Sequence, residues 1–358
     1  MAGILGNHHV WAAVEESTYG TDAVGAAIDA NDDLTYLPFL SGSQIKPSPN
    51  YYRPNQQRAG QDGIAFTTVE NGCSWTLNAP MRGGIGSAFT PAVNFLLKAC
   101  GFGEDTSGGT SSVYTIQTAN DSSFSIWHWA RNLTNNNLRL QRSLGCVGNL
   151  SVSGEIGIEA TIAASGQGIN SGEWTVDRAY FNASDEPALD EAGSSVTYTG
   201  AASLDAGERL ICKSVTMTVG GTVYPCSAWN FDLAFAVGAL GTQTGTYLPE
   251  RIVRTRGDDA NVSGNLALSM AAASAANYGA ALDDVLTKYA ASTEAALQIV
   301  LTGSSAQVTI DMPKIQLQRP EEREDNGAIS WDVGFTANGD FGSSLFGENG
   351  VVITYDAA

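Results

Sequence analysis

Two carboxylates in the stretch NLSVSGEIGIEATIAASGQG, residues 149–168, could form an acid–base pair. Even positions from 150 to 164 are apolar or glycine and odd positions are polar or small, which predicts one long strand. Glu155 and Glu159 then share one face, with Cα atoms about 13–14 Å apart at about 3.4 Å rise per residue. That separation is long for two groups acting on one bond, so a solvated polar face is the favoured interpretation.

The chain has 3 histidines, which limits nucleophilic and metal chemistry. His8 and His9 lie near the start of the sequence, with no further ligands at metal-binding spacing nearby. His128 lies between Trp127 and Trp129, so strand alternation predicts that it faces away from both and is satisfied or solvent-facing. No G-x-S-x-G motif is present, and a Ser-His-Asp triad would need one of these histidines.

Other motifs with a chemical meaning are incomplete. Asp29, Asn31 and Asp33 begin like a calcium-binding loop, but leucines stand where that loop needs its glycine and its glutamate. The segment GGIGSAF, residues 83–89, lacks the third glycine of a dinucleotide-binding fingerprint. We therefore expect no cofactor, no metal site and no enzymatic activity.

Composition and charge narrow the class of protein. The 358 residues include 40 glycines and only 15% charged residues, with many short alternating runs, which is typical of an all-β protein with many turns. The 18 basic and 37 acidic residues give a net charge of −19, which repels nucleic acid and disfavours a DNA-binding role.

Targeting signals and cysteine usage point to a protein made in a cytoplasm. No run approaches the length of a membrane helix, and residues 1–20 lack the basic and apolar regions of a signal peptide. The 5 cysteines are odd in number and lack metal-like spacing, so we expect reduced, buried thiols.

Alternation along the chain predicts a series of strands and two helices. Gly220-Gly221 predicts a tight hairpin turn, and Pro313 predicts a bulge or an edge position. Leucine, valine and tyrosine spacing predicts a helix over 279–291, and a second candidate covers 90–101. The predicted strands cover residues 63–80, 124–130, 138–142, 150–164, 215–219, 222–237, 265–271, 297–301, 307–318 and 328–339.

The order of these elements repeats along the chain. Trp75 and Leu77 occupy the places of Leu266 and Leu268, a helix follows in both halves, and LRLQR (138–142) parallels IQLQR (315–319). The repeat predicts two copies of one β-rich domain with a single helix each. The predicted boundaries are 1–168 for the first domain with its N-terminal arm, 169–204 for a linker or surface insertion, and 205–358 for the second domain.

Three segments resemble the major tail tube proteins of long-tailed, siphovirus-type bacteriophages. They are EESTYGTDA (15–23), LRLQRSLGCVGNLSVSGEIGIEATIAASGQG (138–168) and ISWDVGFTANG in the second copy. The resemblance implies a mainly β fold with one helix per domain, built as tandem tail-tube β-sandwich or half-barrel domains. In that family the strands of neighbouring subunits form an intersubunit β-barrel, and stacked rings enclose a channel for DNA passage during ejection.

The resemblance also implies partners and a location. The chain would assemble with itself into trimeric, pseudo-hexameric rings stacked into a tube, and would meet the tape measure, tail terminator and distal tail proteins. DNA would pass through without specific binding, no membrane would be involved, and the protein would reside in the virion tail after synthesis in the host bacterial cytoplasm.

Particular residues follow from this interpretation. The polar faces bearing Glu155, Glu159 and Asp332 would point into the lumen and repel phosphates, although outward solvent is an equal alternative. Arg142 and Arg319 would form intersubunit or inter-ring salt bridges, with plain exposed arginines as the alternative.

Two other classes remain open from the sequence. One is another virion β-protein such as a head decoration protein. The other is a carbohydrate-binding, adhesin-like β-sandwich, which Trp127, Trp129 and Trp229 could suggest. Alternation places these tryptophans on apolar faces and so favours a core position.

Overall fold

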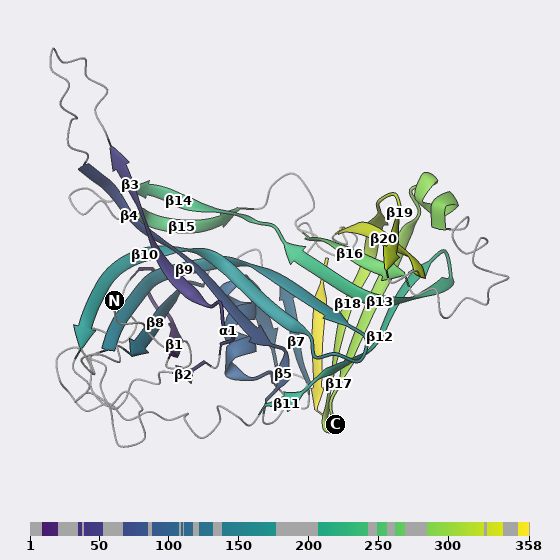
Figure 1. Ribbon diagram of the computed structural model, residues 1–358, viewed down its shortest axis with the longest axis horizontal. Helices are drawn as coiled ribbons and strands as arrows, with labels where there is room; N and C mark the ends of the chain where they lie inside the picture. The colour runs from purple at the N-terminus through teal and green to yellow at the C-terminus, as the bar shows by residue number, and fades with distance from the viewer. Residues whose placement is uncertain are drawn as a thin grey trace, which may run out of the picture.

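The fold is mainly β, as predicted. The computed structural model describes residues 9–20, 35–37, 39–52, 67–84, 88–106, 109, 111–116, 122–131, 138–176, 207–242, 249–255, 262–268, 285–325, 328–338 and 350–357. In Figure 1 the elements up to residue 176, called the first half below, lie on the left around a helix. Most elements from residue 207 onward, called the second half, lie on the right.

The elements of the first half are β1 (His9–Glu15), β2 (Thr35–Tyr36), β3 (Gln44–Tyr52), β4 (Thr67–Pro80), β5 (Arg82–Gly83), α1 (Pro91–Ala99), β6 (Phe102–Asp105), β7 (Ser111–Ile116), β8 (Phe124–Arg131), β9 (Leu138–Glu155) and β10 (Thr161–Val176). Those of the second half are β11 (Glu208–Arg209), β12 (Ile211–Val219), β13 (Thr222–Leu233), β14 (Ala236–Thr242), β15 (Pro249–Thr255), β16 (Val262–Leu268), β17 (Glu294–Thr302), β18 (Ala306–Leu317), β19 (Glu321–Asp325), β20 (Ala328–Ala337) and β21 (Val352–Ala357). Residues 285–290 are also helical.

The first half is a curved sheet with a helix on one face. Its strands follow the order β2-β1-β8-β9-β10-β4-β3. The helix predicted over 90–101 is confirmed as α1, which starts at Pro91, where a missing N–H costs nothing, and is followed by Gly101 at φ 93°. The side chains that α1 buries are Ala92, Val93, Phe95, Leu96, Leu97 and Ala99.

The second half closes into a small barrel. Its ladders run β12-β17-β18-β20-β16-β13 and return from β13 to β12. A barrel this small has room only for side chains. Those with 0% exposure include Met217, Phe231, Ile299, Ile310 and Phe335.

Several predicted details of this barrel are confirmed. Gly220 and Gly221, at φ 54° and 81°, form the turn between β12 and β13. The β17–β18 register shifts opposite the segment that contains Pro313, as expected of a bulge. Of the helix predicted over 279–291, residues 285–290 are helical, and 279–284 lie outside the described residues. The single strand predicted over 222–237 was wrong in extent, because β13 ends at Leu233 and β14 begins at Ala236.

The prediction of one long strand over 150–164 was wrong. The segment is a hairpin, in which β9 ends at Glu155, Gly157 turns the chain at φ 84°, and β10 begins at Thr161. Ile156 and Ile158, expected in the core, are 45% and 53% exposed at the tip.

The alternating pattern did not reveal the turn, because even-numbered residues remain apolar on both sides of it. The ladder pairs Val152 with Ile162 and Leu150 with Ala164, so even-numbered residues face the core on both strands. An unbroken pattern of period two is therefore compatible with a strand or with a hairpin of this register.

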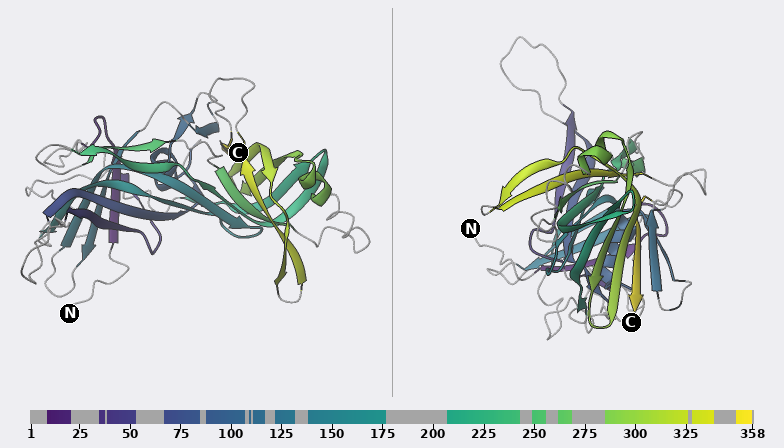
Figure 2. Two further views of the ribbon diagram at one scale, coloured as in Figure 1. Left: turned by 90° about the horizontal axis from the view of Figure 1, so that it is seen from above. Right: turned by 90° about the vertical axis from the view of Figure 1, so that its right-hand side faces the viewer.

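Three strand pairings join the halves. β9 pairs with β13, β21 pairs with β7 as well as with β18, and the short β11 pairs with β5. The left view of Figure 2 shows the two halves lying side by side. The hairpin tip lies between β12 and β13, where Gly157 N–H donates to Cys212 O at 2.9 Å and Ile156 N–H donates to Ser227 O at 2.9 Å.

The strand order contains an internal repeat. The chain order β3, β4, β9, β10 gives the spatial order β3-β4-β10-β9, and the chain order β13, β16, β19, β20 gives β13-β16-β20-β19. A helical segment lies between the second and third strand of each unit. We call these two groups of strands the first and second four-strand unit.

The two units also agree in register. Trp75 pairs with Gly166, and Leu266 pairs with Val333; Gly166 lies as far along its strand from Thr161 as Val333 lies from Ala328. Thr161 and Ala328 are the first ladder residues after their hairpin turns. Residues 169–176, expected to begin the linker, continue β10, and 177–204 lie outside the described residues.

The cysteine prediction is confirmed. Cys73, Cys100, Cys146, Cys212 and Cys226 are all buried and free. Burial raises the pKa of the Cys73 thiol to about 11 and that of Cys226 to about 12. Among the described residues, no helix has the length and apolar character needed to cross a membrane.

Candidate assembly surface

A continuous polar face runs through both halves of the molecule. The two four-strand units join at the β9–β13 ladder into one sheet, β3-β4-β10-β9-β13-β16-β20-β19. One face packs on the core, and the other carries polar side chains aligned in rows across the strands. We call this second face the polar face.

One row brings two predicted residues together. Glu155 pairs with Ala228, Ala228 with Ala267, Ala267 with Asp332, and Asp332 with Glu321. Registered partners in an antiparallel sheet project from the same face. Glu155 and Asp332 therefore lie on one face, separated by two small alanines.

The neighbouring rows are polar and almost uncharged. Their remaining members are Gln44, Lys46, Ser74, Thr76, Asn78, Ser151, Ser153, Thr161, Ala163, Ser165, Gln167, Asn230, Asp232, Ser263, Asn265, Gly334 and Thr336. With the row above, these residues include the acids Glu155, Asp232, Glu321 and Asp332 and one base, Lys46. The register of β19 with β20 adds one further base, Arg323, and one further acid, Asp325, to this face. Acids therefore outnumber bases on the polar face.

The opposite face of the same strands is apolar. Val152 pairs with Phe231, Phe231 with Gly264, and Gly264 with Phe335, and the three large members of this row are 0% exposed. A Cβ at Gly264 would lie 2.7 Å from the Phe335 ring. The glycine therefore leaves the space that the phenylalanine fills.

Glu159 lies apart from Glu155 and Asp332. It sits past the turn, opposite Ile211, and its Oε1 is 2.8 Å from Arg82 Nε. The expectation that Glu155 and Glu159 share one face of one strand was wrong because the turn separates them. Glu159 ties the hairpin tip to β5.

The two predicted arginines lie in different settings. The Arg142 guanidinium lies 5.0 Å from the centroid of the Trp127 ring, a cation–π contact within the chain. Arg319 is exposed after the end of β18. Their segments LRLQR and IQLQR occupy matching places, since Leu138 pairs with the end of β10 and Ile315 with the end of β20.

The β14–β15 hairpin belongs to the second half but docks on the first. Figure 1 shows it beside β4 and β10. At its base, the Asn149 amide donates to Phe235 O at 2.7 Å and accepts from Phe235 N–H at 3.1 Å. On β15, Ile252 is 2% exposed and its N–H donates to the Tyr19 hydroxyl.

A buried carboxylate fixes the segment that carries Tyr19. Glu16 is 8% exposed and accepts four hydrogen bonds. The donors are Gly20 N–H at 2.8 Å, Gly145 N–H at 2.8 Å, the Ser123 hydroxyl at 2.7 Å and the Ser125 hydroxyl at 2.8 Å. Burial, followed by the Glu16 charge, raises the pKa of Tyr19, which keeps its hydroxyl neutral.

The motif GCVGN (145–149) has a physical explanation in these contacts. Gly145 adopts φ 59°, and a Cβ there would lie 2.7 Å from the Tyr19 ring. A Cβ at Gly148 would lie 2.5 Å from Trp75. Sequence reasoning identified the motif but not the role of Asn149 or Glu16, because both act on segments distant in sequence.

The histidines form a packed pair. His9 Nδ1 lies 2.7 Å from His128 Nε2, and the His128 ring stacks on Trp11 with centroids 3.8 Å apart. His128 is therefore satisfied, as predicted. Within the described ranges, no group of three or more metal-ligating side chains occurs.

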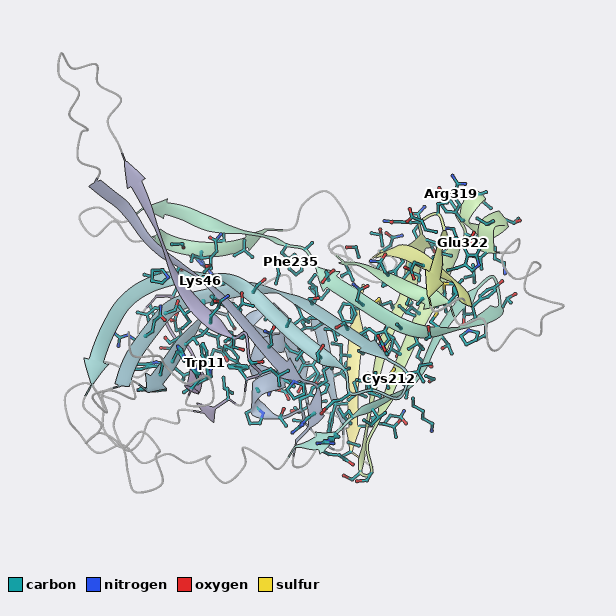
Figure 3. The ribbon with its side chains drawn as sticks, viewed as in Figure 1. Trp11, Lys46, Cys212, Phe235, Arg319 and Glu322 are labelled. Atoms are coloured by element: carbon teal, nitrogen blue, oxygen red, sulfur yellow. The ribbon has the colours of Figure 1, made fainter. Side chains whose placement is uncertain are left out.

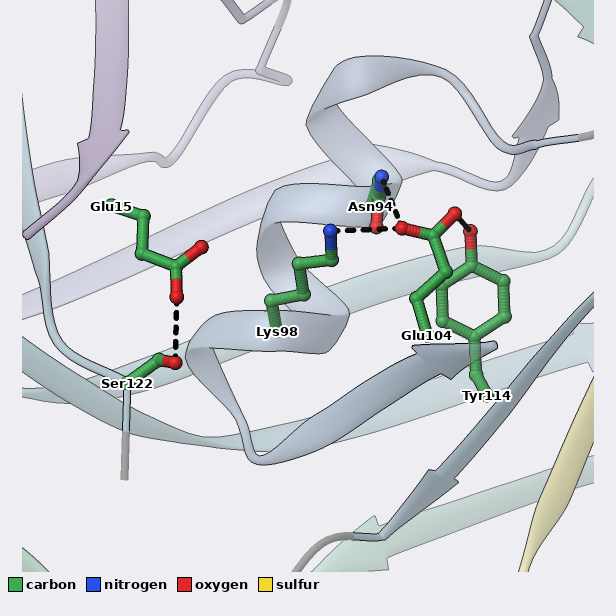
Figure 4. A network of polar contacts seen from close by, with 6 residues as sticks. All are labelled: Glu15, Asn94, Lys98, Glu104, Tyr114 and Ser122. Atoms are coloured by element: carbon green, nitrogen blue, oxygen red, sulfur yellow. Dashed lines mark hydrogen bonds and ion pairs between the residues drawn. The ribbon is translucent and has the colours of Figure 1, made fainter. Parts of the chain in front are cut away.

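Another polar cluster lies beside α1 (Figure 4). Glu104 is 2.8 Å from Lys98 Nζ and accepts from the Tyr114 hydroxyl at 3.0 Å and from the Asn94 amide at 3.3 Å. Burial raises the pKa of Glu104, but these hydrogen bonds and the Lys98 charge outweigh it, so the pKa lies below its ordinary value. An adjacent cavity of about 220 Å³, floored by Phe95 and Phe124, is smaller than the roughly 300–1,000 Å³ of typical ligand pockets.

The comparison with known proteins gives no family for this chain. No family model matches it, and no curated protein matches its sequence.

Proposed function

We propose that this protein is the structural subunit of a bacteriophage tail tube. The observation that carries the proposal is the polar face, which crosses two four-strand units of equal strand order and on which acids outnumber bases. A surface that DNA must pass without binding should lack cations, because cationic contacts to phosphates dominate DNA affinity.

Self-assembly follows from the sheet edges. The sheet that carries the polar face ends at β3 and β19, and each has one strand partner among the described residues. Open edges favour pairing with another chain, and closing a sheet into a barrel removes them. Two units in each chain make three chains sufficient for a pseudo-six-fold ring, and rings stack into the tube.

The orientation of the wall follows from its two faces. Core residues and α1 cover the apolar face, which leaves the polar face for the channel. Glu155 and Asp332 then lie in the lumen, where the net charge of −19 adds to the repulsion of phosphates. The tape measure protein and DNA occupy this channel, and the tail terminator and distal tail proteins bind the two ends of the tube.

The tryptophans that could support a carbohydrate-binding β-sandwich are buried. Trp127, Trp129 and Trp229 are 2%, 4% and 3% exposed, so none offers a ring to a sugar. A head decoration protein remains a distinct outcome of the test below.

Electron microscopy of the purified full chain tests the proposal. We expect rings or tubes with three-fold symmetry and a central channel. A protein that stays monomeric at high concentration, binds phage heads instead, or forms six-fold rings of twelve units contradicts it.

A further inference from the structure

The β9–β13 ladder joins two units that repeat one another. Within the chain, the last strand of the first unit pairs antiparallel with the first strand of the second unit. The corresponding strands at the ends of the sheet are β19 and β3. They lie at opposite ends of the molecule, as Lys46 and Glu322 show in Figure 3, so they cannot meet within one chain.

We infer that β19 of one copy pairs antiparallel with β3 of the next, in the register of the internal β9–β13 ladder. The inference rests on the proposed function and specifies its contact between copies. The occupant of each edge is a second copy because the internal junction shows that these two kinds of strand are complementary.

The register follows from the equivalence of the units. Asn230 pairs with Ser153 at the internal junction. Lys46 is the counterpart of Asn230, since Ile45 faces Trp75 as Trp229 faces Leu266. The counterpart of Ser153 is Asp325, because each is the last ladder residue before its hairpin turn.

The register therefore places Lys46 of one copy opposite Asp325 of the next. Opposite charges directly across a ladder stabilise the pairing. β19 reads EERED, with four acids and one base, and Lys46 is the one base among the described side chains of the polar face. The internal junction has the uncharged pair Asn230 and Ser153 at the same place, so the charge pair distinguishes the contact between copies from the contact within a chain.

Two prolines on β3 reduce the number of backbone hydrogen bonds that its free edge can donate. Side-chain contacts therefore contribute more to this pairing. Asn78 directs its N–H to Ser43 and its C=O to Leu40, so alternate residues of β4 face β3. Pro47 and Pro49 lie opposite the intervening residues and direct their backbone toward the free edge, where they cannot donate. The edge is thereby protected from promiscuous pairing, and the charge pair gains importance for selecting the correct partner.

Disulfide trapping in the full chain tests the register. We introduce Lys46→Cys together with Asp325→Cys and oxidise the purified, assembled protein. Lys46 directs its backbone toward β4, so the pair is non-hydrogen-bonded, with Cα atoms about 4.5 Å apart, within disulfide reach. We expect a covalent ladder on a non-reducing gel that ends at the trimer.

The matched control combines Lys46→Cys with Glu322→Cys. Glu322 is the neighbour of Glu321 on β19 and projects from the other face, so we expect no cross-link. Equal cross-linking in both variants, or rings in the microscope without a cross-link in the test variant, overturns the register. Wild-type protein that forms no rings overturns the proposed function itself.

A charge exchange provides a second, reversible readout. Lys46→Glu should lower the yield of rings at least several-fold, and adding Asp325→Lys should restore it. Unchanged circular dichroism of each variant shows that folding is retained. Failure of the double variant to recover, with both single variants folded, contradicts the pairing.

Discussion

The two four-strand units have the same strand order and register but different support behind them. In the first half, the four-strand unit is part of an open sheet that packs against α1. In the second half, β12, β17 and β18 complete a closed barrel that is filled by side chains. What the halves share is the exposed polar face, and what differs is the packing that holds it. The two halves therefore present the same kind of face on different cores.

The junction between the units contains several backbone ladders and a docked hairpin. It combines the β9–β13 ladder, the β7–β21 ladder, the short β5–β11 ladder and the β14–β15 hairpin held by Asn149. We expect the halves to unfold together, since separating them would break three ladders.

The largest effect is expected from removing a buried aromatic ring from the barrel of the second half. Phe335→Ala removes a fully buried ring and should lower the free energy of unfolding by about 3–5 kcal/mol. Leu97→Ala on α1 is the matched change in the first half, at about 2–5 kcal/mol. Denaturant unfolding followed by tryptophan fluorescence should show one transition in both variants. Two separate transitions would show that the halves are independent.

Removing the Asn149 amide, which holds the base of the β14–β15 hairpin, should have the next largest effect. Asn149→Ala deletes two hydrogen bonds and leaves the Phe235 backbone unsatisfied, which costs roughly 1–3 kcal/mol for such a group. Faster proteolysis between residues 236 and 255 would accompany the loss. Asn78→Ala, on the polar face of β4, serves as a comparison, and equal effects would remove the special role of Asn149.

A dependence on acidic pH is expected from Glu104 in the first half. The folded-state pKa of Glu104 is lowered, so its contribution to stability is complete above the unfolded-state pKa and is lost as pH falls through that value toward the folded-state pKa. Glu104→Gln should flatten this part of the stability profile below about pH 4.5. An unchanged slope in thermal unfolding across acidic pH would show that Lys98 and Tyr114 do not act through this carboxylate.

The smallest effect is expected at the hairpin tip. Glu159→Gln breaks a partly exposed ion pair with Arg82, and such pairs contribute about 0–1 kcal/mol. Raised salt should reduce the difference from wild type. A loss above 2 kcal/mol would show that the tip holds the halves together more strongly than its contacts indicate.

The sequence predicted most strands because alternation reports which face is buried. It also predicted α1, the Gly220-Gly221 turn and the five buried thiols from local signals. It failed at the β9–β10 turn, where the register of the hairpin preserved the alternation and Gly157 was the only sign of a turn. Strand pairing such as Glu155 with Ala228, and the four bonds to Glu16, join segments distant in sequence and were outside the reach of local patterns.

The central claim is that the polar face lines a channel formed by several copies. Cryo-electron microscopy of assembled protein, at a resolution that traces strands, tests it directly. The account predicts a three-fold ring in which Ser153, Asn230 and Asp332 face the channel and α1 lies on the outer side. A ring with α1 toward the channel and these residues on the outer wall would contradict it.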